Sequence, residues 1–222
     1  MVILKDTKSL IWNTNIAYAI GLMTADGNLS SDGRHMTFVS KDLDLIRIFK
    51  RCFSLRNKIS KKSSGYSKDK NKRYYFVQFG NVRLYNFLKD IGLTPNKSKT
   101  IKNLFIPDGY FSDFLRGLID GDGNIGYFMH PESKLKQFRI RVASGSRDFL
   151  EWLNRQINKF LDIRGSIRQV TRAYELCYYK KASKKLVDFI YYKSDIVYLK
   201  RKFKIAKLME TREWWNWQTH TV

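Results

Sequence analysis

Cysteine is scarce in this sequence, and its placement argues against a zinc-bound domain. Cys52 and Cys177 are the only two cysteines among the 222 residues, and neither lies in a Cys-x-x-Cys pair or a Cys/His cluster. A structural zinc site is therefore not expected. Cys52 falls on the apolar face of a predicted helix and Cys177 in a predicted strand. We therefore expect two buried free thiols and a reducing compartment.

Long apolar runs are also missing. The apolar run at residues 16–25 is too short to cross a bilayer, and Lys5, Asp6 and Lys8 interrupt the only early apolar stretch. We therefore expect no signal peptide, no membrane-spanning helix and no membrane partner. The expected location is intracellular: the bacterial cytoplasm, or an organelle or the nucleus of a eukaryotic cell.

Acidic residues are few for the number of basic ones. The chain has 42 Lys and Arg against 20 Asp and Glu, which gives a formal net charge of +22. This balance predicts a polyanionic partner, nucleic acid before a membrane surface. Aromatic residues make up 15% of the chain and are interleaved with bases, as in residues 72–76 (KRYYF). On composition alone, a basic ribosomal-type protein that binds RNA passively is a serious alternative.

The chain is organised around a nine-residue stretch that occurs twice, as AIGLMTADG at residues 19–27 and as LRGLIDGDG at residues 115–123. In each copy a glycine precedes a small residue by four positions. These pairs are Gly21 with Ala25 and Gly117 with Gly121. Residues four apart share one face of a helix, and small side chains there let two backbones approach closely. The two copies are therefore predicted to be helices that pack against each other.

Each copy ends in Asp-Gly. A glycine at a helix end can adopt positive φ and stop the helix. Asp26 and Asp122 would then lie at helix C-termini, where the macrodipole disfavours a carboxylate. If the two helices pack together, both carboxylates meet at one end, and a divalent metal ion supplies a reason to hold them there.

These two nonapeptides resemble the LAGLIDADG motif of homing endonucleases. The second copy, with residues 114–123 reading FLRGLIDGDG, is similar to the form typical of single-chain members with two motifs. In the first copy Met23 and Thr24 replace Ile and Asp. The eighth position, which carries the metal-binding acid in that family, is Asp in both copies, 96 residues apart (122 minus 26). The resemblance covers roughly residues 13–207.

The resemblance implies an α+β fold of two pseudo-symmetric αββαββα halves. The motif helices would pack at the central interface, and antiparallel sheets would form a DNA-binding saddle. We place the halves at residues 1–105 and 106–222, with a linker at 101–111 and Ser112 as the cap of the second motif helix. Apolar periodicity and turn residues predict the same order twice. The expected strands, helices and hairpins are residues 34–40, 42–55, 58–79, 82–91, 124–130, 137–143, 147–161, 165–179 and 183–192.

The resemblance also implies a metal-dependent nuclease site at the two motif ends. Asp26 and Asp122 are the expected metal ligands. Backbone carbonyls at the motif ends, those of Ala25 and Gly121, would complete the coordination of Mg²⁺ or another divalent cation such as Mn²⁺. Asp120 lies two positions before its neighbour on the helix, so it points elsewhere and is expected to make a hydrogen bond at the helix end.

Family members often keep a lysine near each cleavage site. Lys97 and Lys202 occupy corresponding places after the last element of each half. A catalytic lysine can polarise the attacking water or stabilise the charge that develops on the phosphate. The neighbouring Lys99 and Lys200 compete for this role, and a simple contact to DNA phosphate is the alternative.

Basic residues on the predicted strands and turns are candidate DNA contacts. Arg139 and Arg141 alternate with Phe138, Ile140 and Val142, which gives this strand one basic and one apolar face. The major groove admits a β-ribbon, from which Arg can read guanine or hold phosphate. An ordinary solvated sheet face is the alternative. The candidates are Arg34, Lys61, Lys72, Arg73, Lys136, Arg139, Arg141, Arg168, Arg172 and Lys180.

Together with the resemblance, these features predict a monomeric homing endonuclease that hydrolyses double-stranded DNA at a long, asymmetric target site. Its gene is expected to be intron-encoded, with a free-standing gene as the alternative. Two alternatives stay open. One is an RNA maturase of the same fold that assists intron splicing, and the other is a DNA-binding regulator without nuclease activity. The retained pair of Asp26 and Asp122 favours cleavage.

Residues 213–222 (EWWNWQTHTV) place three tryptophans within four residues. The tryptophans either dock on the second half or rest on DNA. A second interpretation comes from the codons, because the back-translated TGG-TGG-AAY-TGG-CAR-ACN resembles the 5′ part of a leucine tRNA gene. On that interpretation the reading frame runs into a tRNA gene, and the tail is dispensable for cleavage.

Overall fold

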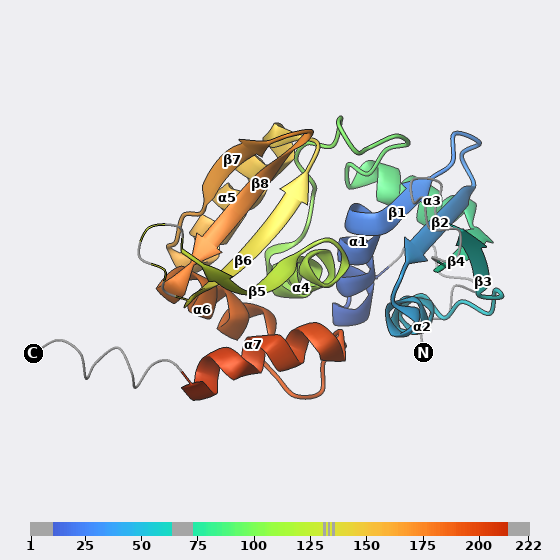
Figure 1. The fold of residues 1–222 in the computed structure, drawn as a ribbon. Helices are drawn as coiled ribbons and strands as arrows, with labels where there is room; N and C mark the ends of the chain where they lie inside the picture. The colour runs from blue at the N-terminus through green and yellow to red at the C-terminus, as the bar shows by residue number, and fades with distance from the viewer. Residues whose placement is uncertain (1–10, 64–72, 131, 133, 135, 213–222) are drawn as a thin grey trace, which may run out of the picture.

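The computed structural model describes residues 11–63, 73–130, 132, 134 and 136–212. Lys72 of the candidate DNA contacts and the tryptophan-rich tail lie outside these residues. The described chain forms two halves, each with a sheet and helices, on either side of a central helix pair (Figure 1). No helix in this part of the chain combines the length and apolarity that a membrane crossing requires.

The two halves repeat one order of elements. The first half contains α1 (Thr14–Asp26), β1 (Gly27–Leu29), β2 (His35–Ser40), α2 (Leu43–Cys52), β3 (Ser60–Ser63), β4 (Arg73–Gly80) and α3 (Val82–Asp90). The second half contains η1 (Asp108–Tyr110), α4 (Phe111–Gly121), β5 (Asn124–Met129), β6 (Lys136–Ser144), α5 (Arg147–Leu161), β7 (Ser166–Val170), β8 (Ala173–Tyr179), α6 (Lys180–Ile190) and α7 (Lys200–Arg212). The antiparallel sheets have matching strand orders, β1-β2-β4-β3 and β5-β6-β8-β7. The predicted α+β class and the αββαββα order are confirmed, and α7 is an additional helix.

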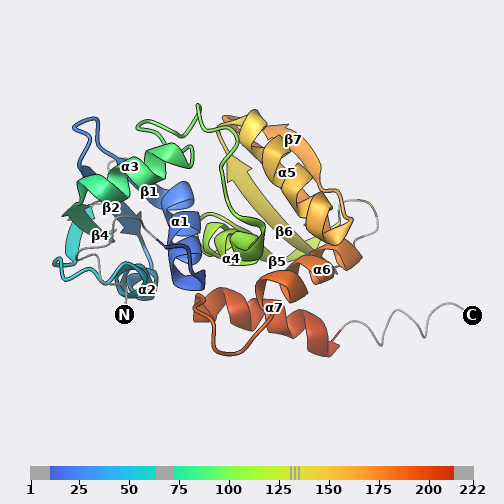
Figure 2. The same cartoon turned by 180° about the vertical axis from the view of Figure 1, so that it is seen from behind.

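Each sheet has one covered and one open face. Figure 1 shows α1 and α4 between the sheets, and Figure 2 shows α3 and α5 across the sheets from behind. The covered faces are apolar. In the first half, for example, Phe38 of β2 stacks on Phe49 of α2 with ring centroids 4.4 Å apart. Cys52 and Cys177 are buried free thiols, as predicted.

The helices α1 and α4 cross where their glycines meet. A Cβ atom built on Gly21 would lie 2.1 Å from the carbonyl oxygen of Phe114, and one built on Gly117 would lie 2.0 Å from that of Tyr18. The two backbones are thus in direct contact, and a larger residue at either position would require the helices to separate. The predicted close packing of the motif helices is confirmed.

The glycines that follow the two aspartates are required because a side chain would not fit there, and not because the backbone needs a positive φ angle. Gly27 has a φ of −83° and a ψ of 152°, and Gly123 does not have positive φ, so the expected left-handed helix stop is wrong. A Cβ on Gly27 would lie 2.5 Å from the carbonyl oxygen of Met23, and one on Gly123 would lie 2.6 Å from that of Ile119. At the end of each motif helix, the backbone of the following residue packs directly against the last turn of the helix. Only glycine fits at this position.

Side-chain caps set several of the helix starts. Asn13 caps α1 and Ser146 caps α5, each accepting the backbone N–H three residues later, at 2.9 and 3.3 Å. Such caps satisfy backbone donors that the helix leaves unpaired. Ser112 was expected to cap α4, but this prediction is wrong. The 3-10 turn η1 leads into α4 at Phe111, and the N-cap residue Tyr110 makes no side-chain capping bond.

Candidate active site and nucleic-acid interface

Asp26 and Asp122 lie together at the C-terminal ends of the packed motif helices. Asp26 is the last residue of α1, and Asp122 is the C-cap of α4. Both side chains reach solvent, yet the surrounding protein and the adjacent Asp122 carboxylate raise the pKa of Asp26 to about 7. Partial desolvation by the surrounding protein also raises the pKa of Asp122. The structure thus brings two mutually repelling carboxylates, the acid pair, to one point.

The oxygen atoms at this point suit a hard divalent cation. Carboxylates and carbonyls are ligands that Mg²⁺ accepts, and a cation at the acid pair would offset the repulsion by Asp122 that contributes to the raised pKa of Asp26. Within the described residues, no three His, Cys, Asp or Glu side chains form a group that could hold a metal ion. The remaining ligands would therefore be water and carbonyls such as those of Ala25 and Gly121. With these ligands, the residues present fit the predicted ion.

A buried lysine lies at the end of each motif helix. Lys97 follows α3 and is 8% exposed, and Lys202 in the first turn of α7 is 5% exposed. The Lys97 ammonium donates to the carbonyls of Gly27 at 2.6 Å and Ala25 at 3.3 Å. The Lys202 ammonium donates to four carbonyls, those of Ile119 (2.6 Å), Asp120 (2.9 Å), Gly121 (3.2 Å) and Gly123 (2.6 Å). Each lysine therefore caps one motif helix beside the acid pair.

The structure separates the competing lysines. Lys99 and Lys200 are exposed, whereas Lys97 and Lys202 are buried at the helix ends. Burial lowers the pKa of both buried lysines, for Lys202 to about 8, while nearby carboxylates oppose the decrease. A lysine whose pKa is lowered toward neutrality can exchange a proton more readily than a surface lysine.

Lys202 depends on a helix that the sequence did not predict. On α7 and just before it, Leu199 is 2% exposed, Ala206 is fully buried and Phe203 is half-buried. The spacing of four and three residues marks one apolar face of a helix. This signal lies in the run at residues 200–204 (KRKFK), whose dense positive charge resembles a solvated segment.

Asp120 does not join the acid pair. Its carboxylate is 1% exposed and accepts hydrogen bonds from the Tyr18 hydroxyl and the Leu199 backbone N–H, both at 2.7 Å. The expected hydrogen-bonding role is confirmed. The partners differ from expectation, because they lie on α1 and immediately before α7 instead of at the end of α4.

The open face of the second sheet is basic. Along β6, Arg139 and Arg141 face away from the buried apolar residues, as the alternation predicted. Glu175 of β8 is 8% exposed and accepts hydrogen bonds from Arg141 at 2.8 Å and from Arg168 of β7 at 2.7 Å. Burial opposes ionisation of Glu175, but the Arg168 hydrogen bond and the charges of both arginines lower its pKa. One buried acid therefore orients two guanidinium groups on this face.

Among the described residues, the open face of the first sheet is less basic than that of the second. Lys62 pairs with Tyr74 across the strands and places its ammonium 5.8 Å from the centroid of the Phe76 ring. The candidate Lys61 lies on the other face, opposite Tyr75. Of these two adjacent lysines, the structure thus places Lys62 on the open face, and β3 is too short for its sequence to show this alternation.

The other described candidates lie at the rims of the sheets. Arg34 precedes β2 and Arg172 lies in the turn between β7 and β8, and both are exposed. Arg73, Lys136 and Lys180 are the first residues of β4, β6 and α6. The rim residues are spread over both halves, whereas the three arginines of the second sheet share one surface.

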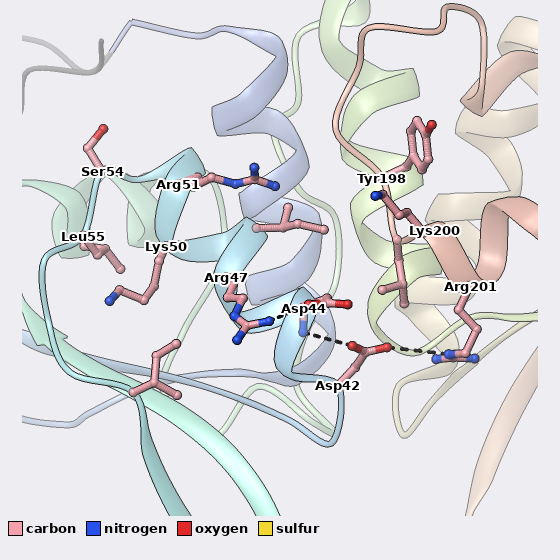
Figure 3. Close-up of a pocket in the computed structure, with 13 residues that line it drawn as sticks. Asp42, Asp44, Arg47, Lys50, Arg51, Ser54, Leu55, Tyr198, Lys200 and Arg201 are labelled. Atoms are coloured by element: carbon pink, nitrogen blue, oxygen red, sulfur yellow. Dashed lines mark hydrogen bonds and ion pairs between the residues drawn. The ribbon is translucent and has the colours of Figure 1, made fainter.

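A basic cleft of about 850 Å³ lies between α2 and the start of α7. Figure 3 shows Arg47, Lys50 and Arg51 on the α2 side, and Lys200 and Arg201 on the other side. Asp42 connects the two sides, with its carboxylate 3.6 Å from Nε of Arg201. The residues that line the cleft do not include the acid pair or the buried lysines. The cleft is therefore a charged junction between the halves, separate from the candidate active site.

The arrangement of two four-stranded antiparallel sheets around a pair of crossed helices is the fold of solved LAGLIDADG homing endonucleases. In agreement, residues 13–92 match the family model described as a LAGLIDADG-like domain. The matched residues span α1 to α3, so they cover the first half of the chain. The second half repeats the same order of elements.

Solved structures give the particular relatives. The chain is similar to full-length DUF199/WhiA from Thermatoga maritima, with a TM-score of 0.57 and 17% identity over 93% of this chain and 63% of that chain. This chain thus spans less than two thirds of that protein. It is also similar to the homing endonuclease I-WcaI bound to its DNA recognition sequence, with a TM-score of 0.59 and 14% identity over 92% of this chain and 96% of that chain. The meganuclease I-SmaMI bound to uncleavable DNA has a TM-score of 0.58 and 14% identity over 93% and 92% of the respective chains. No curated protein matches the sequence.

Proposed function

We propose that the protein is a metal-dependent, sequence-specific endonuclease of double-stranded DNA that acts as a monomer of the homing endonuclease type. The observation that carries the proposal is the acid pair, Asp26 and Asp122, held at the meeting ends of α1 and α4 with one buried lysine at each end. A protein that only bound DNA would gain nothing from two carboxylates that repel each other and the phosphate backbone.

Each part of this site has a role in phosphodiester hydrolysis, which needs a water placed in line with the leaving oxygen. A bound divalent cation would supply Lewis acidity and an activated water. Asp26 and Asp122 would hold that cation. Lys97 and Lys202 place one positive charge at each helix end, where it stabilises negative charge on a phosphate or holds a proton. The open sheet faces hold the duplex in register.

The relatives support a DNA partner. The structures of I-WcaI and I-SmaMI, and that of I-LtrWI bound to target DNA, combine DNA with the same fold. The formal net charge of +22 and the arginines on the second sheet suit a phosphate backbone. Encoding within an intron and an intracellular, reducing location belong to the same proposal.

A DNA-binding protein without nuclease activity is the second candidate. DUF199/WhiA shares the fold with a TM-score of 0.57. The two candidates share the fold and the DNA partner, so only a cleavage assay separates them.

A cleavage selection on a randomised duplex library tests the proposed function. We expect Mg²⁺-dependent double-strand cuts at one long, asymmetric sequence, and no cuts when the metal is removed by a chelator. Sequence-specific binding without cleavage in either Mg²⁺ or Mn²⁺ would instead establish the second candidate. A protein that selects structured RNA over duplex DNA would indicate the maturase alternative.

Substituting the arginines on the open face of the second sheet should weaken duplex binding and flatten its salt dependence. Each lost phosphate contact reduces the slope of log K against log salt by roughly 0.9, so the double variant Arg139→Ala/Arg141→Ala should lose up to about 2. Arg155→Ala is the matched control, because Arg155 is exposed on α5, which covers the opposite face of this sheet. Binding would be measured by fluorescence anisotropy at several salt concentrations. Equal slopes for the double variant and the wild type would show that this face does not contact phosphate.

A further inference from the structure

The two motif helices differ at one buried position. Asp120 on α4 corresponds to Thr24 on α1, since each lies three residues after the crossing glycine, Gly117 or Gly21. The Thr24 hydroxyl donates to the carbonyl of Ile20 at 2.9 Å and thus stays within its own helix. Asp120 instead bonds to groups outside α4. The pseudo-symmetry of the halves is therefore broken next to the acid pair.

Asp120 connects several parts of the chain. Its carboxylate accepts the Tyr18 hydroxyl of α1 and the Leu199 backbone N–H, both at 2.7 Å, and the Tyr191 hydroxyl lies 3.4 Å away. A carboxylate that is 1% exposed is costly to bury unless its oxygens are hydrogen-bonded. The three donors meet this need, and they lie in both halves of the chain.

The hydrogen bond between the Asp120 carboxylate and the Leu199 backbone N–H connects Asp120 to Lys202. The Leu199 carbonyl accepts the backbone N–H groups of Lys202 at 3.0 Å and Phe203 at 3.1 Å, which closes the first turn of α7. The Lys202 ammonium also donates to the Asp120 carbonyl at 2.9 Å. Asp120 thus fixes both the turn that carries Lys202 and a carbonyl that receives its ammonium.

No carboxylate supports Lys97 in the same way, because Thr24 occupies the position that corresponds to Asp120. The Lys97 carbonyl accepts the backbone N–H groups of Thr100 at 3.1 Å and Ile101 at 2.9 Å, so the local turn is closed by the backbone. The Ile101 carbonyl in turn accepts the hydroxyl of Ser146, the cap of α5 in the other half. The two lysines therefore occupy similar positions but are held by different interactions.

We infer that Asp120 is a positioning residue for Lys202, and that its loss selectively impairs cleavage of the DNA strand next to Lys202. This inference rests on the proposed nuclease function. A duplex presents one scissile phosphate on each strand, and the pseudo-two-fold arrangement assigns one lysine to each. Because Asp120 bonds to the turn that carries Lys202 and not to the turn that carries Lys97, an Asp120 variant should behave as an enzyme with one normal and one slow half-site.

Strand-resolved cleavage of a duplex with a different label on each strand tests this inference. Lys202→Met and Lys97→Met first identify the strand that depends on each lysine. Asp120→Asn should slow the Lys202 strand by roughly 10–100-fold, as is typical for residues that orient a functional side chain, and nicked duplex should accumulate. Thr24→Val is the matched control at the corresponding position and should leave the ratio of the two strand rates unchanged. Equal slowing of both strands by Asp120→Asn would overturn the inference.

Hydrogen exchange supplies a readout that does not depend on activity. In Asp120→Asn, exchange at residues 198–203 should become several-fold faster, while residues 95–101 exchange as in the wild type. If Asp120→Asn does not fold, Tyr18→Phe removes one donor and should produce the same strand bias to a smaller degree. If the wild type cuts neither strand, the nuclease proposal fails, and unchanged exchange at residues 198–203 would separately overturn the positioning role.

Discussion

Asp26→Asn and Asp122→Asn are each expected to abolish DNA cleavage while preserving DNA binding. Asparagine keeps the shape of the side chain but removes the charge that attracts a divalent cation. Loss of metal-assisted chemistry costs several kcal/mol of transition-state stabilisation, which is on the order of a thousandfold or more in rate. Binding should be equal to or tighter than that of the wild type, because each variant removes a negative charge that faces the phosphate backbone.

The measurement combines a cleavage time course with binding to the same duplex without metal. Asp90→Asn is a suitable control, since Asp90 is an exposed acid at the end of α3 and lies outside the site. This control removes the same charge and should cut at the wild-type rate. Cleavage by either site variant at a rate near that of the wild type would rule out the acid pair as the metal site.

Gly117→Ala is expected to destabilise the protein strongly, because a Cβ here would make the closest contact found at any of the described glycines. The new Cβ would lie 2.0 Å from the carbonyl oxygen of Tyr18, and its next two nearest atoms, at 2.8 and 3.1 Å, are also Tyr18 backbone atoms. A side chain could rotate away from such a contact, but a helix backbone cannot. The helices must therefore move apart, at a cost at or above the roughly 1–3 kcal/mol typical of overpacked cores.

Chemical denaturation of the wild type and the variant measures this cost. Gly109→Ala is the matched control, because a Cβ at Gly109 would meet no atom within 4 Å and Gly109 lacks positive φ. We expect its midpoint to equal that of the wild type within error. An unchanged midpoint for Gly117→Ala would mean that α1 and α4 do not cross at these glycines.

The sequence predicted the features that depend on local spacing. Gly21 and Gly117 marked the helix crossing because small residues four apart are rarely needed for anything else in an amphipathic helix. The alternation of Arg139 and Arg141 with apolar residues predicted which face of β6 is open, because strand periodicity is strict. The α5 bounds also agreed, since Ser146 is a strong cap directly before an apolar periodic run.

Features that depend on contacts between distant segments could not be predicted. Nothing local to Asp120 indicates that its carboxylate accepts hydrogen bonds from Tyr18 and Leu199, which are 102 and 79 residues away. Similarly, the resemblance favoured Lys97 over Lys99, but nothing local to either lysine indicates which one is buried, because the turn after α3 determines this. Gly27 is a different case, because the sequence identified the need for glycine but assigned it to the φ angle instead of to contact with Met23.

The connection between the halves has a consequence for hybrid proteins. Lys97 lies on this connection and donates to the carbonyls of Ala25 at the end of α1 and of Gly27, while the carbonyl of Ile101 on the same segment accepts the hydroxyl of Ser146 from the other half. The segment is thus a shared part of both halves and not a passive tether. A chimera that recombines halves from two relatives would have to cross over after residue 101, and its second parent would need a hydroxyl at the α5 cap. A crossover between α3 and Lys97 would combine a motif helix from one parent with the lysine of the other.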